Sequence, residues 1–182
     1  MRTASNNERG FTLIELMMTV AVAATLLAVG VPVLMDVTEG SKLNAAAREV
    51  ERELQSARLK AVSVNRSLRV RLNCPAAGYL RTVEVLGTAA DSAADRCLAP
   101  YPVDTTLNGV LTRPFYDGPV RVLPNLATVT DAVVEFRSDG TAYRVVANVA
   151  QVMAAPLTLT VTRSGKSKAM TINGSGKIQY QQ

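Results

Sequence analysis

Apolar residues run almost without interruption through the first part of the chain. Between Phe11 and Met35 the only ionisable side chain is that of Glu15. A run of this length can cross a bilayer as one helix. The pattern therefore predicts a membrane-spanning helix over residues 11–35, preceded by a short polar segment over residues 1–10.

Farther along the chain, apolar positions recur at steps of three and four, which is the period of one helix face. The opposite face is charged, and Glu49 and Arg52 are spaced for an i,i+3 ion pair. We therefore expect one long helix from Phe11 to about Val64, with its second half packed on a domain. The apolar positions of this second half are Leu43, Ala46, Ala47, Val50, Leu54, Ala57 and Ala61.

The rest of the sequence consists of short runs rich in β-branched residues, separated by turn signals such as "SDGT", "SGK" and "NGSG". In "RSLRVRLNC", Leu68, Val70 and Leu72 fall on one side of a strand and two arginines on the other. Six or seven strands of this kind predict an antiparallel sheet whose apolar face the amphipathic helix covers. The expected fold is α+β, with residues 87–118, rich in Ala, Asp and Pro, mostly loop.

Composition excludes several kinds of active site. The chain has no histidine, so imidazole metal ligands and histidine-based triads are absent. "RSGKS" and "GSGK" look like phosphate-binding loops, but Thr160 and Thr171 stand where such a loop needs its first glycine. The same residues could form a Ser–Lys nucleophile pair. Exposed Ser, Gly and Lys residues are, however, typical of an ordinary hairpin turn, which is the simpler interpretation. We therefore expect no enzyme activity, no metal and no cofactor.

The first ten residues, "MRTASNNERG", are polar and carry two arginines. A basic flank keeps the N-terminus in the cytoplasm and directs the rest of the chain outward. A signal peptide cut after "AVA", Ala21 to Ala23, is the alternative. Such a cut would leave twelve further residues of the apolar run exposed at the new N-terminus, which disfavours this alternative.

Pro32 lies deep in the apolar run, shortly after Gly30. A proline removes one backbone hydrogen bond and predicts a weak point in the helix, with a second near Glu39 and Gly40; membrane helices tolerate such residues. Together with the leader, the pattern resembles the type IV pilin and pseudopilin superfamily, in which a short basic leader ending in glycine precedes phenylalanine, a "TLIEL" stretch and a kinking proline. The matching positions are Gly10, Phe11, Thr12, Leu13, Ile14, Glu15, Leu16 and Pro32.

The resemblance implies processing and assembly. In the superfamily a prepilin peptidase cuts after the glycine and methylates the new N-terminal amine, which places the cut between Gly10 and Phe11 and makes residues 1–10 a cleaved leader. It also implies that the Glu15 carboxylate pairs with the Phe11 ammonium of a neighbouring subunit, which recovers much of the cost of a charge in hydrocarbon. The alternative is a glutamate that snorkels to the interface.

The stretch "LNAAAREVERELQSARLKAVSVNRSLRVRL" resembles the helix-into-strand signature of the GspH/FimT group of minor pilins and pseudopilins. The likeness covers residues 9 to about 72 and is weak beyond them. It implies a structural subunit of a type IV pilus or type II secretion pseudopilus, placed at initiation or at the tip, with other pilins as partners. Residues 36–182 would then form a periplasmic domain anchored to the inner membrane.

Both cysteines, Cys74 and Cys97, follow the apolar run, so after export they can meet in an oxidising compartment. We expect a disulfide that joins the first strand to the long loop, which otherwise has little to order it. Two buried free thiols are the alternative. Major pilins usually carry their pair near the C-terminus, so this early pair speaks against a major pilin.

The charge of the last quarter is positive, with five cations from Asp139 onward against that single acid. Four of them are candidate DNA-binding residues, because a basic patch attracts phosphates. Some members of the superfamily bind DNA through a Gly-Arg-x-Arg loop; "GKIQ", Gly176 to Gln179, keeps the glycine and one cation only. DNA capture in natural transformation is therefore the alternative function, and a solvated hairpin is the simpler interpretation. The four candidates are Arg163, Lys166, Lys168 and Lys177.

Overall fold

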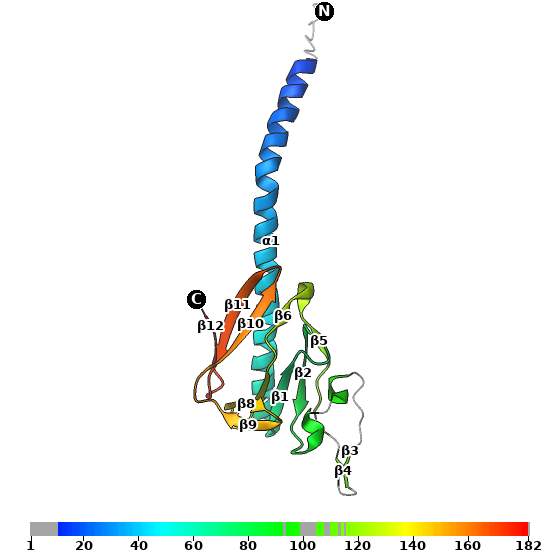
Figure 1. The fold of residues 1–182 in the computed structure, drawn as a ribbon, viewed down its shortest axis with the longest axis vertical. Helices are drawn as coiled ribbons and strands as arrows, with labels where there is room; N and C mark the ends of the chain where they lie inside the picture. Colours follow the sequence, from blue (N-terminus) through cyan, green and yellow to red (C-terminus); the bar gives the residue numbers. More distant parts are fainter. Residues whose placement is uncertain are drawn as a thin grey trace, which may run out of the picture. The chain divides into compact units, whose positions relative to one another are not determined.

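The computed structural model describes residues 11–92, 94–98, 105–107, 110–112, 114 and 116–181. The chain divides into two compact units, one ending at Thr38 and one beginning at Glu39. Helix α1 (Leu13–Val64) contributes residues to both units (Figure 1). The leader, including Gly10, lies outside the described residues.

The first unit is helical from Leu13 onward. The weak points expected at Gly30–Pro32 and at Gly40 do not break α1, which stays helical through both. Proline removes one donor, but the hydrogen bonds of the neighbouring turns remain and keep the helix continuous. The expected boundaries of this helix, Phe11 and about Val64, are confirmed to within two residues.

The second half of α1 presents one apolar face to the β-strands, as predicted. All seven expected positions are buried: Leu43, Ala46, Ala47, Val50, Leu54, Ala57 and Ala61. The small alanines let the strands approach closely. The predicted ion pair between Glu49 and Arg52 is present on the opposite face, at 2.5 Å. One charged residue, Glu53, is buried with the apolar ones.

A six-stranded antiparallel sheet forms the larger β-layer, in the order β5-β2-β1-β7-β8-β9. Its central strand β1 pairs Val70 with Thr82 on one side and with Val134 on the other. This register turns Leu68, Val70 and Leu72 into the core, as the alternation predicted. The strands are β1 (Leu68–Leu72), β2 (Tyr79–Glu84), β5 (Arg121–Val122), β7 (Val133–Phe136), β8 (Ala142–Val146) and β9 (Val149–Val152).

The other strands do not extend that sheet. A second, four-stranded sheet has the order β12-β11-β10-β6. The segment after β9, "MAAP", ends in Pro156, which cannot donate to a ladder, and β10 instead turns its own apolar residues to the core. These strands are β6 (Thr128–Val129), β10 (Leu157–Arg163), β11 (Lys166–Ile172) and β12 (Ile178–Tyr180).

Residues 87–118 contain more structure than the expected loop. They include the 3₁₀ helices η1 (Ala89–Ser92) and η2 (Asp95–Cys97) and a hairpin of β3 (Thr105–Leu107) and β4 (Val110–Thr112). A third 3₁₀ turn, η3 (Pro124–Leu126), joins β5 to β6.

Both sheets and the second half of α1 share one apolar core. It includes Phe136 of the larger sheet, Met170 of the smaller sheet and Leu54 of α1. Figure 1 shows the strands of both sheets alongside this part of the helix. The core lies entirely within the unit that begins at Glu39.

Candidate functional site

The helix that carries Glu15 begins with a side-chain cap. The backbone N–H of Glu15 donates to Thr12 Oγ1 at 3.3 Å, and the N–H of Leu16 donates to the Thr12 carbonyl oxygen at 3.2 Å. Thr12 is thus the N-cap and Glu15 the third helical residue, the spacing of a capping box. An acidic residue in the first turn also complements the helix dipole. The signal, "TLIE", was present in the sequence and was missed.

The apolar segment is exposed along its whole described length, from Phe11 to Thr38. Phe11 is 75% exposed and Leu13 77%. By length and composition α1 can cross a membrane, with a window of mean hydropathy 2.2. Its threonines are compatible with an apolar environment because each donates to a carbonyl oxygen three residues earlier, at 2.7 to 2.8 Å. These threonines are Thr19, Thr25 and Thr38.

Of the candidate basic residues, Arg163 lies at the end of β10 and is largely engaged. Its Nε donates to the Asn125 carbonyl oxygen at 2.6 Å, and its guanidinium pairs with Glu39. Its side chain is 14% exposed. Hydrogen bonds from Lys42 first, and then from Ser164 and Arg163, hold the pKa of Glu39 below its ordinary value.

The three candidate lysines lie on β11 and the turn that follows it. Lys166 is paired in register with Arg163 across the β10–β11 hairpin. Lys168 Nζ donates to Asn44 Oδ1 at 2.7 Å and lies 4.5 Å from the ring centre of Tyr180. Lys177 is exposed before β12. The structure therefore brings Arg163, Lys166 and Lys168 to one hairpin and leaves Lys177 on the next turn.

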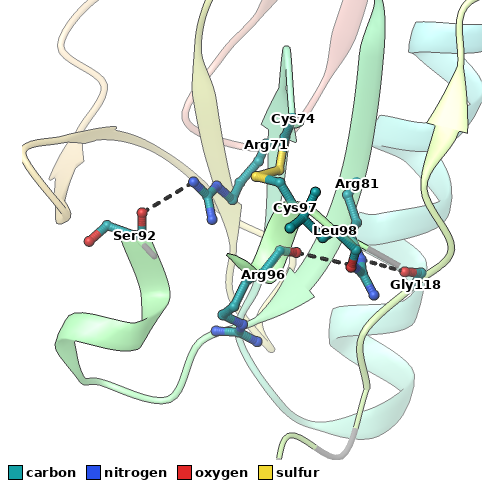
Figure 2. Close-up of a disulfide and its surroundings, with 8 residues drawn as sticks. All are labelled: Arg71, Cys74, Arg81, Ser92, Arg96, Cys97, Leu98 and Gly118. Carbon is teal, nitrogen blue, oxygen red and sulfur yellow. Dashed lines mark hydrogen bonds between the residues drawn. A yellow bond between two sulfur atoms is a disulfide. The ribbon is translucent and has the colours of Figure 1, made fainter. Parts of the chain in front are cut away.

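The predicted disulfide between Cys74 and Cys97 is present, with a Cα–Cα distance of 5.0 Å (Figure 2). Both cysteines are buried. The bond joins the end of β1 to η2, so it fastens the segment after β2 to the outer face of the larger sheet.

The expectation that this segment has little else to order it is wrong. Arg81 of β2 donates to the carbonyl oxygens of Arg96, Leu98 and Gly118, the last at 2.8 Å. Arg71 of β1 donates to the Ser92 carbonyl oxygen at 3.2 Å. Figure 2 shows these arginines around the disulfide. Arginines of β1 and β2 thus hold this segment through its carbonyl oxygens, in addition to the disulfide.

A fully buried ion pair cluster lies in the same segment. Arg96 has no exposed side-chain surface, and its guanidinium lies 3.0 Å from Asp91 and 2.7 Å from Asp117. Asp91 also accepts hydrogen bonds from the backbone N–H groups of Leu86 and Gly87. Buried charges are tolerated when they are paired in this way.

Two further ion pairs that involve buried carboxylates were not predicted from the sequence. Glu53 of α1 accepts a hydrogen bond from the Thr82 hydroxyl at 2.8 Å and lies 2.7 Å from Arg121 Nε. Arg69 of β1 donates to Glu135 at 2.8 Å and is buried, on the side of the strand opposite Leu68. Their partners are distant in sequence, so no local pattern could reveal them.

Residues 5–31 match the family model described as the prokaryotic N-terminal methylation motif. The chain therefore carries this motif, followed by a long N-terminal helix and an antiparallel α+β fold, which is the combination that the resemblance to the type IV pilin superfamily predicted. None of the curated proteins matches the chain significantly.

Two solved proteins illustrate the similarity of fold. The type IV minor pilin FimU of Pseudomonas aeruginosa is 20% identical, with a TM-score of 0.49 over 80% of this chain and 92% of that chain. The minor pseudopilin EpsH from the type 2 secretion system of Vibrio cholerae is 12% identical, with a TM-score of 0.45 over 77% of this chain and 96% of that chain.

Proposed function

We propose that the chain is a minor pilin or pseudopilin of the GspH/FimT type, a non-enzymatic structural subunit of a type IV pilus or type II secretion pseudopilus. The N-terminal methylation motif at residues 5–31 is the observation that carries this proposal. The exposed apolar helix from Phe11 to Thr38 supports it, because such a surface needs lipid or neighbouring subunits to cover it.

The proposal divides the chain by role. Residues 1–10 are a leader that a prepilin peptidase removes between Gly10 and Phe11, after which the Phe11 amine is methylated. Residues 11–35 anchor the protein in the inner membrane and later enter the filament core, with Pro32 inside this helix. Residues 36–182 form the periplasmic domain. The subunit enters the filament at initiation or at the tip, and its Glu15 carboxylate pairs with the Phe11 ammonium of a neighbouring subunit.

Processing is the first test. Protein purified from its own membranes should begin at Phe11 and carry one methyl group on its amine, as measured by intact mass and N-terminal sequencing. A chain that begins after Ala23, or one that keeps residues 1–10, would contradict the proposal. Crosslinking followed by pull-down then distinguishes a pilus from a secretion pseudopilus by the subunits recovered.

DNA capture during natural transformation is the second candidate, favoured by the cations of the β10–β11 hairpin and by Lys177. The engagement of Arg163 with Glu39 and Asn125 reduces the charge available there, so we rank this function below the structural one. Full-length protein in detergent can be titrated with duplex DNA at low and moderate salt. Salt-sensitive binding that is lost when Lys166, Lys168 and Lys177 become Ala would support it.

A further inference from the structure

Three segments of the second unit meet at Glu39, the residue that follows Thr38. The guanidinium of Arg163 pairs with the Glu39 carboxylate, and Ser164 Oγ donates to the same carboxylate at 3.1 Å. Arg163 Nε also donates to the carbonyl oxygen of Asn125 in η3. The β10–β11 turn is therefore held directly at Glu39, and Arg163 joins η3 to the same turn. Figure 1 shows the β10–β11 turn and the connection from β5 to β6 at the same end of this unit.

Leu126 projects from this end and is not buried by any of the residues that the structure describes. Its side chain is 95% exposed, and its φ is +58°, directly after Asn125 at +62°. Left-handed backbone disfavours a branched apolar side chain, and turns that need it use glycine or asparagine. Folding of this chain buries almost none of the Leu126 side chain, so burial does not offset the cost of its backbone conformation. Such an outlier points to a contact with something outside the chain.

Positive charge surrounds the same end. Lys42 lies on α1 one turn after Glu39 and pairs with it at 2.9 Å. Lys166 is the register partner of Arg163, and Lys168 is hydrogen-bonded to Asn44 of the same stretch of α1. Against the carboxylates of Glu39 and of Asp36, one helical turn earlier on α1, the cations Lys42, Arg163, Lys166 and Lys168 leave a net charge of +2 (four minus two).

We infer that this end of the second unit is a lipid-contacting surface, with Leu126 in the interfacial zone of a bilayer and the cations on the phosphates of anionic lipids. This inference rests on the proposed membrane span at residues 11–35. One leucine and a few cations bind a membrane weakly on their own. Here the proposed membrane span tethers the domain to the bilayer, because Glu39 follows this segment closely in the chain. The tether raises the effective concentration of the surface at the membrane, so a weak contact suffices.

A bilayer fits these observations better than a second protein does. A specific protein interface needs a large complementary surface, whereas a single projecting leucine among cations requires only an apolar layer beneath a negative one. The contact would hold the domain against the membrane before assembly and would have to open when the subunit enters a filament.

Tryptophan fluorescence tests this directly, because the chain contains no tryptophan. Three full-length single variants are reconstituted into vesicles of phosphatidylglycerol and phosphatidylcholine, with and without brominated acyl chains. Leu126→Trp reports on the proposed surface. Val152→Trp, at a 77% exposed position on β9, is the matched control, and Val22→Trp reports on the span.

We expect bromolipid quenching of Leu126→Trp to exceed that of Val152→Trp at least about twofold, with a blue-shifted emission. Adding Lys42→Ala and Lys166→Ala to Leu126→Trp, or removing phosphatidylglycerol, should reduce the quenching, whereas adding Lys177→Ala should not. Equal quenching on purely zwitterionic lipids would overturn the anionic-lipid assignment.

The control at residue 22 separates the two proposals. If Val22→Trp is quenched while Leu126→Trp matches Val152→Trp, the lipid-contacting surface is refuted and the span stands. If Val22→Trp is not quenched, the membrane span itself fails. The emission of Leu126→Trp could instead shift to the blue as the protein-to-lipid ratio rises, without quenching by brominated lipids. That result would assign the surface to a second copy of the chain and overturn the inference.

Discussion

Single residues carry more than one role at the start of α1. Thr12 caps the helix through its hydroxyl, and it does so by accepting from the backbone N–H of Glu15. The Glu15 carboxylate is therefore not needed for that bond and remains available for another partner. A cap and an assembly contact can be separated by substituting one residue at a time.

Replacing Glu15 with Leu should leave membrane insertion intact or improved, because the segment becomes more apolar. Incorporation into filaments should fall, since the neighbouring Phe11 ammonium loses its counter-charge. Thr12→Ala is the matched control, because it removes the cap and keeps the carboxylate. Subunit content of sheared filaments, measured by immunoblot, decides; normal incorporation of Glu15→Leu would count against the pairing.

Glu39 should titrate below its ordinary pKa of 4.5, because hydrogen bonds from Lys42, Ser164 and Arg163 favour its charged form. A lowered pKa in the folded state means that the stabilising contribution is complete above pH 4.5 and is lost as the pH falls through the folded value. Carbon-13 NMR of the Glu39 carboxyl measures this directly. In Arg163→Ala the pKa should rise toward 4.5, and an unchanged value would show that the contact is not maintained in solution.

At the scale of elements, the second half of α1 has one face in the core and one in solvent. Leu54 is fully buried, whereas Leu59, five residues later, is 71% exposed. Because both residues are leucines on the same helix, any difference between the effects of substituting them comes from burial.

Leu54→Ala should lower the free energy of unfolding by about 2 to 5 kcal/mol, because it removes buried methyl groups and leaves a cavity. Leu59→Ala should change that free energy by less than about 0.5 kcal/mol. Chemical denaturation followed by circular dichroism measures both. Equal effects would mean that the helix does not present this face to the sheets.

The disulfide should stabilise the domain by roughly 3 kcal/mol in the chain-entropy model, for a sequence separation of 23 residues. Unfolded, unreduced protein should show no thiol that reacts with a labelling reagent. The double variant Cys74→Ala and Cys97→Ala should unfold more easily yet keep slow hydrogen exchange at Gly87, because Asp91 still accepts from its N–H. Two labelled cysteines in that unfolded, unreduced protein would refute the bond.

At the scale of the whole molecule, the two units differ in where their apolar residues lie. The first unit is exposed and apolar from Phe11 to Thr38, apart from Glu15, Asp36 and hydroxyl or small residues. The second contains the whole apolar core. Folding of the second unit should therefore not depend on the first.

A fragment from Glu39 to Gln182 should stay soluble without detergent and unfold cooperatively, because it retains the complete core. A shorter fragment that begins at Val50 loses the buried residues Leu43, Ala46 and Ala47. Its thermal midpoint should be lower by several degrees, on the order of 5 °C for each kcal/mol lost in a domain of this size. Aggregation of the longer fragment would show that the apolar segment is needed for folding.

Local patterns in the sequence determined the elements that depend on local chemistry. Unbroken apolarity and helical periodicity predicted α1 and its seven buried positions, and alternation predicted the core face of β1. The leader and "TLIEL" carried the resemblance to the type IV pilin superfamily, because the motif and the apolar segment consist of consecutive residues. Late strands such as β9 and β6 are too short to stand out from their turns.

Only the tertiary structure decided which strands pair and which charges are buried. β10 follows β9 in the chain but belongs to a second sheet, because pairing depends on a register between distant segments. Glu53 with Arg121, and Arg163 with Glu39, join residues whose separation in sequence leaves no periodic trace. The exposure of Leu126 could not be predicted from the sequence, since it lies in a turn whose residue Asn125 accepts a hydrogen bond from the distant Arg163 of β10.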